Sequence, residues 1–201
     1  KGMSNLKTDV LIIGAGPSGI FTALEMLKNG SKKKIMIVEK GLPVEKRHCP
    51  KAKTGKCVNC KPDCNITTGF SGAGAFSDGK LSLSCEVGGN LPDLIGHEFA
   101  QQMIEYTDGI YLSFGADKKV EGVGHDEIKA IRLRAIQAGL KLVDCPIRHL
   151  GTEMAQELYG KIEKHLTDNG VEIIFKTECV DLIVEDGRAK GAVFLPCGKP
   201  E

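Results

Sequence analysis

A glycine-rich run close to the N-terminus has the spacing of a phosphate-binding turn. Residues 14–19 read GAGPSG, which is the pattern G-x-G-x-x-G. In such a run Gly14 permits a tight turn, Gly16 lets the backbone approach a pyrophosphate without a Cβ, and Gly19 lets a helix pack against the preceding strand. This spacing predicts the binding of a dinucleotide through its phosphates.

An acidic residue follows this run at the distance expected for ribose recognition. Glu39 stands twenty residues after Gly19, at the end of a second apolar run. Its carboxylate can accept hydrogen bonds from a ribose diol and would repel a 2′-phosphate, so NADP is disfavoured at this site. A helix would begin near Pro17 and Ser18. Its first amides have no acceptors within the helix and would face the phosphates with a positive partial charge.

Half of the cysteines are gathered in one loop. Of the eight in the chain, four fall within 16 residues: Cys49, Cys57, Cys60 and Cys64. Residues 46–61 contain six Lys or Arg and no acid, a setting that favours thiolates. Three interpretations stay open: a structural zinc ion or iron–sulfur cluster, a redox dithiol, and thiols without a cofactor. The Cys57-x2-Cys60 spacing favours the first, and the lack of helical periodicity after Cys57 argues against the second.

Alternating strands and helices would position these residues. Apolar runs predict three buried parallel strands, at 9–13, 35–39 and 171–177. Amphipathic periodicity predicts four helices, at 18–29, 95–106, 126–138 and 152–168. A further strand is expected at 140–144, and Asp186-Gly187 between residues 179–185 and 190–195 predicts a hairpin. Residues 41–93 have little regular pattern, which is uncommon unless such a loop is functional.

The overall composition is that of an ordinary globular chain. Hydrophobic residues make up 41% and charged residues 26% of the 201 residues, and the formal net charge is +1. This balance gives no support to nucleic-acid binding. No apolar run approaches the length that crosses a membrane, and the first residues lack the apolar core of an export signal. We therefore expect a cytoplasmic protein.

Two parts of the sequence resemble a known superfamily. Residues 14–19 together with Glu39 resemble the N-terminus of FAD-binding oxidoreductases of the glutathione-reductase type. Residues 177–180, 186–187 and 191–193 are similar to the strand-and-hairpin element of that superfamily. The resemblance implies that Val180 holds the adenine through its backbone.

The middle of the chain resembles a narrower group. Residues 69–81 read GFSGAGAFSDGKL and are similar to a segment of FAD-dependent dehydrogenases related to the bile-acid-type and aminoacetone-type flavoproteins. Residues 47–50 and the Cys57-x2-Cys60 pair are similar to the same group. The resemblance implies that the glycine-rich segment lies along the pyrophosphate and ribityl chain of FAD. The residues themselves support this, because glycines among small side chains let a backbone pass against a flat ligand, and Lys80 could neutralise a phosphate.

The fingerprint and the resemblance together imply FAD as the cofactor and a set of residues that bind it. These are Gly14, Gly16, Pro17, Ser18, Gly19, Glu39, Lys40, Arg47, Gly72, Gly74, Ser77, Lys80, Leu81 and Val180. No catalytic base is assigned. Surface or capping roles are favoured for His97, His125 and His149, and Asp78 is either a turn former or a flavin-site group.

We expect an α/β chain with a Rossmann-like FAD/NAD(P)-binding fold, in three layers with a parallel sheet and an inserted segment. Residues 3–81 would form the first part of the FAD-binding domain, 82–150 an insertion on the substrate-domain side, and 151–201 the continuation that ends in the hairpin. The superfamily continues with two more parallel strands and a Gly-Asp element. The chain is therefore expected to be about the first half, with an exposed sheet edge that would favour a homo-oligomer.

The expected function is that of an FAD-dependent oxidoreductase, which moves a hydride between a small-molecule substrate and flavin. This fragment alone need not be active. Two alternatives stay open: a non-catalytic nucleotide or metal-binding module, and an NAD-dependent enzyme in which Glu39 binds the NAD ribose. The substrate and the electron acceptor do not follow from the sequence.

Overall fold

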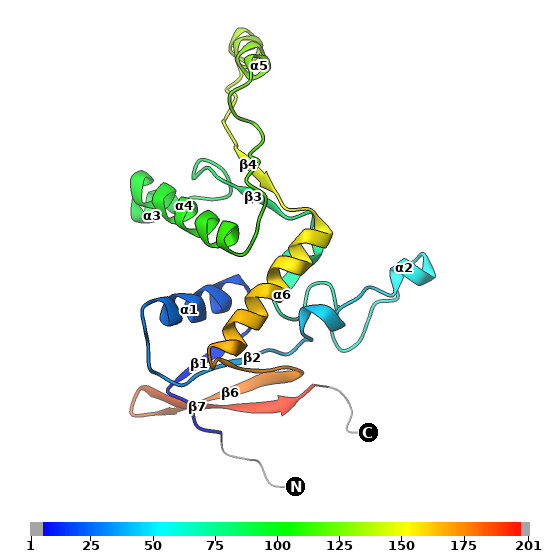
Figure 1. Cartoon of the computed structure of the whole chain (residues 1–201), viewed down its shortest axis with the longest axis vertical. Helices are drawn as coiled ribbons and strands as arrows, with labels where there is room; N and C mark the ends of the chain where they lie inside the picture. Colours follow the sequence, from blue (N-terminus) through cyan, green and yellow to red (C-terminus); the bar gives the residue numbers. More distant parts are fainter. Residues whose placement is uncertain (1–5, 198–201) are drawn as a thin grey trace. The chain divides into compact units, whose positions relative to one another are not determined.

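The computed structural model describes residues 6–197 and divides the chain into two compact units (Figure 1). The first unit contains the described residues 6–76 and 159–197, and the second contains residues 77–158. The assignment of residues 3–81 and 151–201 to an FAD-binding domain and of 82–150 to an insertion stays a prediction. Its outermost residues, 3–5 and 198–201, lie outside the described part of the chain.

A parallel sheet of three strands forms the centre of the first unit. Its order is β1 (Val10–Ile13), β2 (Ile35–Val38) and β5 (Glu172–Ile174). Every residue of the central strand β2 is buried, which accounts for its uninterrupted apolar sequence. The three predicted parallel strands are confirmed. The third is shorter than the predicted 171–177, because the chain leaves the sheet before Lys176, whose backbone is left-handed (φ 53°).

A helical layer and a hairpin lie on opposite sides of this sheet (Figure 1). The helices are α1 (Pro17–Lys28) and the C-terminal part of α6 (Thr152–Asp168). Helix α1 buries Ile20, Ala23 and Leu24 at helical spacing. Residues Ile162 and Leu166 of α6 are likewise buried. The first unit therefore has the predicted three-layer α/β architecture.

The hairpin consists of β6 (Thr177–Glu185) and β7 (Arg188–Pro196). Its turn residues Asp186 and Gly187 both have positive φ, 50° and 72°, which is the conformation that a two-residue hairpin turn requires. The predicted hairpin is confirmed, and both strands are longer than expected.

The connection from β2 towards the second unit has little regular structure. It contains a 3₁₀ turn η1 (Val44–Lys46), a short helix α2 (Lys51–Thr54) and a 3₁₀ helix η2 (Gly72–Phe76). This connection lies within the segment in which the sequence shows no clear helical or strand periodicity.

The second unit combines a small antiparallel ribbon with three helices and the first residues of α6. Its elements are β3 (Lys80–Ser82), α3 (Leu91–Ile95), α4 (His97–Ser113), α5 (Asp126–Gln137) and β4 (Ile147–His149). Arg148 of β4 is buried and donates to both carboxylate oxygens of Asp108 on α4, over 2.6 and 2.7 Å. This forked ion pair raises the pKa of Arg148 and joins the ribbon to the helix.

Two predictions about the second unit need correction. The strand expected at 140–144 is wrong, because those residues have no regular structure and the strand follows Pro146 instead. Pairing with β3 begins at Ile147, where the chain meets its partner strand. The helix expected at 95–106 begins at His97 and continues to Ser113.

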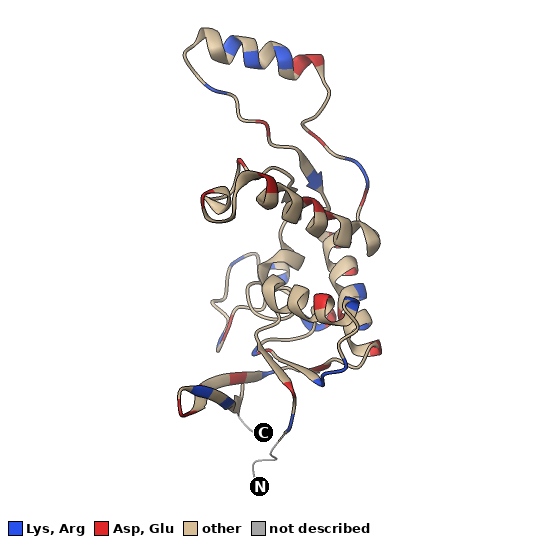
Figure 2. Cartoon of the chain, turned by 90° about the vertical axis from the view of Figure 1, so that its left-hand side faces the viewer, with Lys and Arg blue, Asp and Glu red and all other residues tan. Residues whose placement is uncertain are grey.

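Acidic and basic residues are interspersed along the chain in both units (Figure 2), in keeping with the balanced net charge. Among the helices of residues 6–197, none combines the length and the apolar character needed to span a bilayer.

Candidate functional site

The glycine fingerprint lies in the loop that joins β1 to α1. Gly14 has a φ of 94°, and its amide donates to the carbonyl of Val38 at the end of β2 over 2.8 Å. A Cβ on Gly19 would lie 2.2 Å from the carbonyl oxygen of Gly14, so the helix starts in direct contact with the turn. The close approach explains why a glycine is needed at the third position of the fingerprint.

The N-terminus of α1 is open to an anion. Gly16 is its N-cap residue in an extended conformation, Pro17 follows, and no side chain caps the helix. The first turn, which includes Ser18, contains no acidic residue. A Cβ built on Gly16 would meet no heavy atom within 4 Å. The positive end of the helix therefore faces space that phosphate oxygens can enter, and the residues present fit a dinucleotide pyrophosphate.

Glu39 connects the end of β2 to the fingerprint loop. The residue is only 6% exposed. Its Oε2 accepts a hydrogen bond from the amide of Ala15 over 2.8 Å, and its Oε1 accepts one from the amide of Gly41 over 2.7 Å. A carboxylate offers about four acceptor positions, so these two bonds leave capacity for a ribose hydroxyl.

The glycine-rich segment is bound to the same loop. The amide of Ser71 donates to the carbonyl of Ala15 over 2.7 Å, and Gly69 pairs with Leu42 just beyond β2. Ser71 is fully buried and has a φ of 71°. Segments about fifty-five residues apart in the sequence thus lie side by side around the fingerprint.

Within that segment, two predicted cofactor residues differ in their surroundings. A Cβ on Gly74 would lie 3.1 Å from the hydroxyl oxygen of Tyr159, so Gly74 leaves room for α6. Gly72 has a φ of 58° and open space where a Cβ would point. Of the two, Gly72 is the position at which a ligand could approach the backbone.

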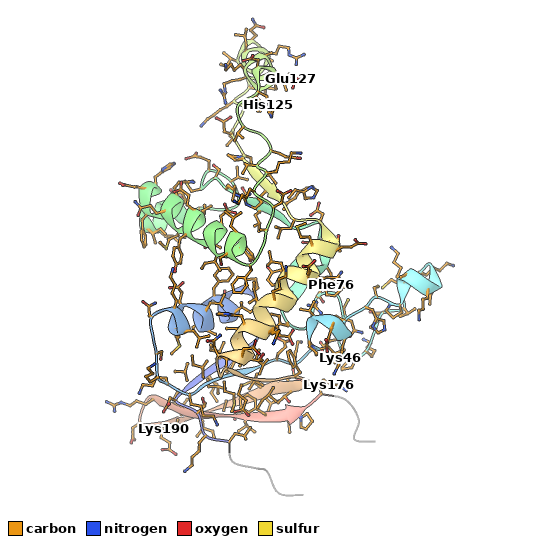
Figure 3. The ribbon with its side chains drawn as sticks, viewed as in Figure 1. Lys46, Phe76, His125, Glu127, Lys176 and Lys190 are labelled. Atoms are coloured by element: carbon orange, nitrogen blue, oxygen red, sulfur yellow. The ribbon has the colours of Figure 1, made fainter. Side chains whose placement is uncertain are left out.

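Arg47 organises the glycine-rich segment from within. It is 4% exposed, and its guanidinium donates to four backbone carbonyls, those of Asn65, Ile66, Phe70 and Gly72, over 2.5–2.8 Å. Its Cζ also lies 4.5 Å from the centre of the ring of Phe76, which is labelled in Figure 3. Burial lowers the pKa of Arg47, and nearby Glu39 partly opposes this. Since four of its five N–H groups are engaged, the guanidinium acts as a clamp on this segment.

The remaining predicted residues of the first unit lie near its surface. Lys40 forms an ion pair with Asp63 over 3.0 Å, and the hydrogen bond raises the pKa of Lys40. Val180 lies at a β-bulge, because Cys179 pairs with Phe194 and Asp181 with Val193. A bulged residue is left out of the regular ladder, which suits the predicted backbone contact of Val180 with adenine.

Three predicted cofactor residues belong to the second unit: Ser77, Lys80 and Leu81. Lys80 Nζ forms an exposed ion pair with Asp78 over 2.8 Å. The hydrogen bond between them raises the pKa of Lys80 and lowers that of Asp78. Asp78 also accepts the amide of Gly151 through its backbone carbonyl, in keeping with a role in the turn.

The cysteine loop does not form a closed ligand set in the described residues. All eight cysteines of the chain have free thiols, and no three sulfurs of the loop lie within 4.8 Å of one another. The amides of Ile66 and Thr67 donate to the thiol of Cys64 and lower its pKa. The zinc or iron–sulfur assignment to Cys49, Cys57, Cys60 and Cys64 stays a prediction.

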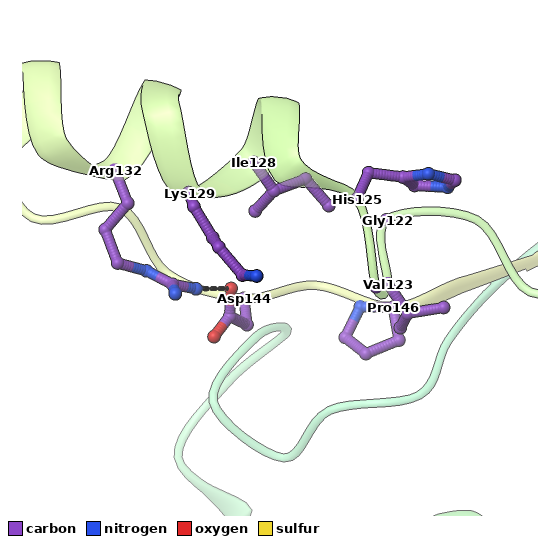
Figure 4. Close-up of a pocket in the computed structure, with 9 residues that line it drawn as sticks. Gly122, Val123, His125, Ile128, Lys129, Arg132, Asp144 and Pro146 are labelled. Atoms are coloured by element: carbon purple, nitrogen blue, oxygen red, sulfur yellow. Dashed lines mark hydrogen bonds and ion pairs between the residues drawn. The ribbon is translucent and has the colours of Figure 1, made fainter.

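Sequence reasoning missed two features of the second unit. Cys85, Glu86 and His97 bring their ligand atoms together. A cavity of about 290 Å³ also lies beside α5, lined by residues 122–125, Ile128, Lys129, Arg132, Asp144 and Pro146. Arg132 and Asp144 form an ion pair across it (Figure 4). The first feature has a signal in the sequence, a Cys-Glu pair shortly before a helix that begins with His.

No protein-family model matches the chain. An uncharacterized protein of Clostridium beijerinckii is 38% identical over 192 residues, which is 96% of this chain and 29% of that protein. The chain therefore spans less than a third of the length of this relative.

One solved structure shares the architecture at low sequence identity. A 3-ketosteroid-Δ4-(5α)-dehydrogenase from Rhodococcus jostii, solved with 4-androstene-3,17-dione, superposes with a TM-score of 0.56 at 14% identity, over 96% of this chain and 42% of the other. The chain has a Rossmann-like fold. THI4 from Thermovibrio ammonificans gives a TM-score of 0.48 at 15% identity, over 94% of this chain and 48% of its own. Glycine oxidase from Bacillus cereus gives a TM-score of 0.48 at 16% identity, over 95% of this chain and 55% of its own. The fold assignment rests on the superposition with the dehydrogenase and on the parallel sheet of β1, β2 and β5.

Proposed function

We propose that this chain binds FAD and belongs to an FAD-dependent oxidoreductase that transfers a hydride between a small molecule and the flavin. The observation that carries the proposal is the arrangement around Ala15. Its amide donates to Glu39, its carbonyl accepts from Ser71, and the uncapped helix α1 starts two residues later. The residues predicted to bind the ribose, the residues predicted to bind the pyrophosphate and the glycine-rich segment thus lie close to one another.

Each part of this region has a distinct task. The amides at the start of α1 would bind the pyrophosphate, and Gly16 would leave it room. Glu39 would accept hydrogen bonds from the adenosine ribose while it holds the loop through Ala15. Arg47 would fix the backbone of residues 65–72, so that Gly72 presents its backbone to the ligand. When bound, FAD supplies the group that accepts or gives the hydride.

The choice of FAD over NAD rests on the glycine-rich segment. The fingerprint and Glu39 suit the adenosine of either cofactor. The sequence resemblance implies that this segment lies along the ribityl chain, which FAD has and NAD lacks. The attachment of Ser71 to Ala15, which brings residues 69–74 beside the fingerprint loop, supports this placement. An NAD-dependent enzyme or a non-catalytic nucleotide-binding module are the alternatives.

Equilibrium dialysis of the purified chain with FAD, FMN and NAD separates these alternatives. We expect FAD to bind, FMN to bind more weakly because it lacks the adenosine, and NAD to bind more weakly than FAD. Reduction of bound FAD by dithionite, followed by its visible absorption, would then establish a redox-active flavin. Preference for NAD would overturn the proposal in favour of an NAD-dependent enzyme, and binding of none of the three would overturn the dinucleotide site.

A further inference from the structure

Three donor atoms of different chemistry meet in the second unit. Cys85 Sγ lies 3.4 Å from His97 Nε2, and Glu86 Oε1 lies 2.5 Å from the same nitrogen. All three atoms lie within 4.8 Å of one another, and residues 6–197 contain no other such group of three His, Cys, Asp or Glu. None of the three belongs to the proposed FAD site.

The thiol and the carboxylate approach one nitrogen, which distinguishes this group from a catalytic triad. In a triad the imidazole bridges its two partners through its two different ring nitrogens. A single Nε2 carries at most one proton and therefore cannot donate to both Cys85 and Glu86. A cation placed between the three atoms can satisfy all of them at once.

We propose that Cys85, Glu86 and His97 form a binding site for a divalent transition-metal ion, with zinc as the best match. Thiolate, imidazole and carboxylate are the ligand types that zinc takes in proteins. Two ligands at about 2.0–2.3 Å from a tetrahedral ion lie roughly 3.3–3.8 Å apart, and the sulfur–nitrogen distance already falls in that range. The carboxylate is closer, and Glu86 moves outward on binding. Water occupies the fourth position of the tetrahedron.

The backbone around the group is held before any ion arrives. Gln101, one turn after His97 on α4, accepts the amide of Cys85 through Oε1 and donates to the carbonyl of Leu83 through Nε2, each over 3.1 Å. The Gln101 side chain fixes the backbone of residues 83–85 against α4, the helix that carries His97. Cys85 is 5% exposed, whereas the His97 side chain is 64% exposed. The sulfur therefore forms the floor of the site, and the ion enters from solvent.

Titration with Co²⁺ and then Zn²⁺ tests this site. The parent carries Cys49, Cys57, Cys60 and Cys64 all replaced by Ser, so that thiols of the other loop do not contribute. We expect one equivalent of Co²⁺ with a thiolate-to-cobalt absorption band, which Zn²⁺ displaces. Cys85→Ser abolishes the band, and His97→Asn and Glu86→Gln each weaken binding at least about tenfold. Cys145→Ser, a thiol of the same unit outside the group, leaves both unchanged.

Circular dichroism checks that each variant is folded. Because the Glu86 side chain is about half exposed, we expect Glu86→Gln to fold like the parent. Absence of the band in the parent would overturn the proposal. So would equal affinity in the parent and in Cys85→Ser or Glu86→Gln. FAD binding is measured on the same samples, so that failure of this site and failure of the proposed function are distinguishable.

Discussion

The Oε2 atom of Glu39 and the amide of Ala15 lie 2.8 Å apart, so a buried carboxylate joins the end of the second strand to the loop after the first. The same carboxylate also accepts the amide of Gly41. Its predicted role in ribose binding is therefore combined with a role in the fold of the site itself. Mutations here should change stability as well as affinity.

Replacing Glu39 with Ala should lower the free energy of unfolding by about 1.5–3 kcal/mol in the absence of cofactor, because the buried amide of Ala15 and the half-buried amide of Gly41 lose a charged acceptor. Urea denaturation measures this loss. The dissociation constant for FAD should also rise, by about ten- to a hundredfold. Glu39→Gln is the matched control, since it keeps an acceptor for one amide. Equal stability of wild type and Glu39→Ala would contradict the structural role.

Gly16 and Gly19 should respond differently to an added side chain. A Cβ at Gly16 meets nothing within 4 Å, so Gly16→Val should unfold like wild type and lose measurable FAD binding. A Cβ at Gly19 overlaps the carbonyl of Gly14, so Gly19→Ala should be destabilised by about 1–3 kcal/mol or more. Thermal unfolding and FAD dialysis on both variants check the contrast. Full FAD affinity in Gly16→Val would remove the fingerprint argument.

Arg47→Lys should loosen the glycine-rich segment while the sheet persists. A lysine ammonium cannot reproduce the planar fork that reaches four carbonyls, and buried carbonyls left without a donor cost about 1–3 kcal/mol each. Hydrogen exchange followed by mass spectrometry should show faster exchange in residues 65–76 and unchanged protection in β2. An unchanged exchange pattern across residues 65–76 would show that the clamp is dispensable.

Alkylation of Cys64 should depend on pH in a defined direction. Amides of Ile66 and Thr67 stabilise its thiolate and lower its pKa, so the thiolate fraction at neutral pH exceeds that of an ordinary cysteine. The rate with iodoacetamide should reach half its maximum at a lower pH in the folded chain than in a peptide of residues 60–68. Peptide mass mapping at a series of pH values makes the comparison. Coincident profiles would rule out the effect of the two amides.

The strands and turns around the proposed nucleotide site could be predicted from the sequence because local patterns determine them. Apolar runs gave the three parallel strands, and Asp186-Gly187 gave the hairpin turn. The clamp of Arg47 could not be predicted, because its acceptors are backbone carbonyls that any residue type provides. The expected strand at 140–144 failed for a related reason: a short apolar run becomes a strand only where a partner strand lies beside it.

The group of Cys85, Glu86 and His97 shows a further limit. Its two parts are separated by α3 and by Gly96, whose positive φ of 84° turns the chain into α4. The Cys-Glu pair and the histidine are visible in the sequence, but their spacing does not give the direction in which the chain turns at Gly96. The distances between the donor atoms therefore had to come from the structure.

The pairing of Leu42 with Gly69 has an evolutionary consequence. Gly41 and Gly69 pack backbone against backbone, and a Cβ on Gly41 would lie 2.4 Å from the amide nitrogen of Gly69. The entrance and exit of the cysteine loop are thus fastened together beside the proposed nucleotide site, by this contact and by Arg47 near the start of the loop. Much of the stretch between them, including the tip with its cysteines and lysines, can lengthen, shorten or exchange its residues as a cassette. Selection can then change the residues of that tip for another function while the fingerprint loop and the glycine-rich segment keep their structure.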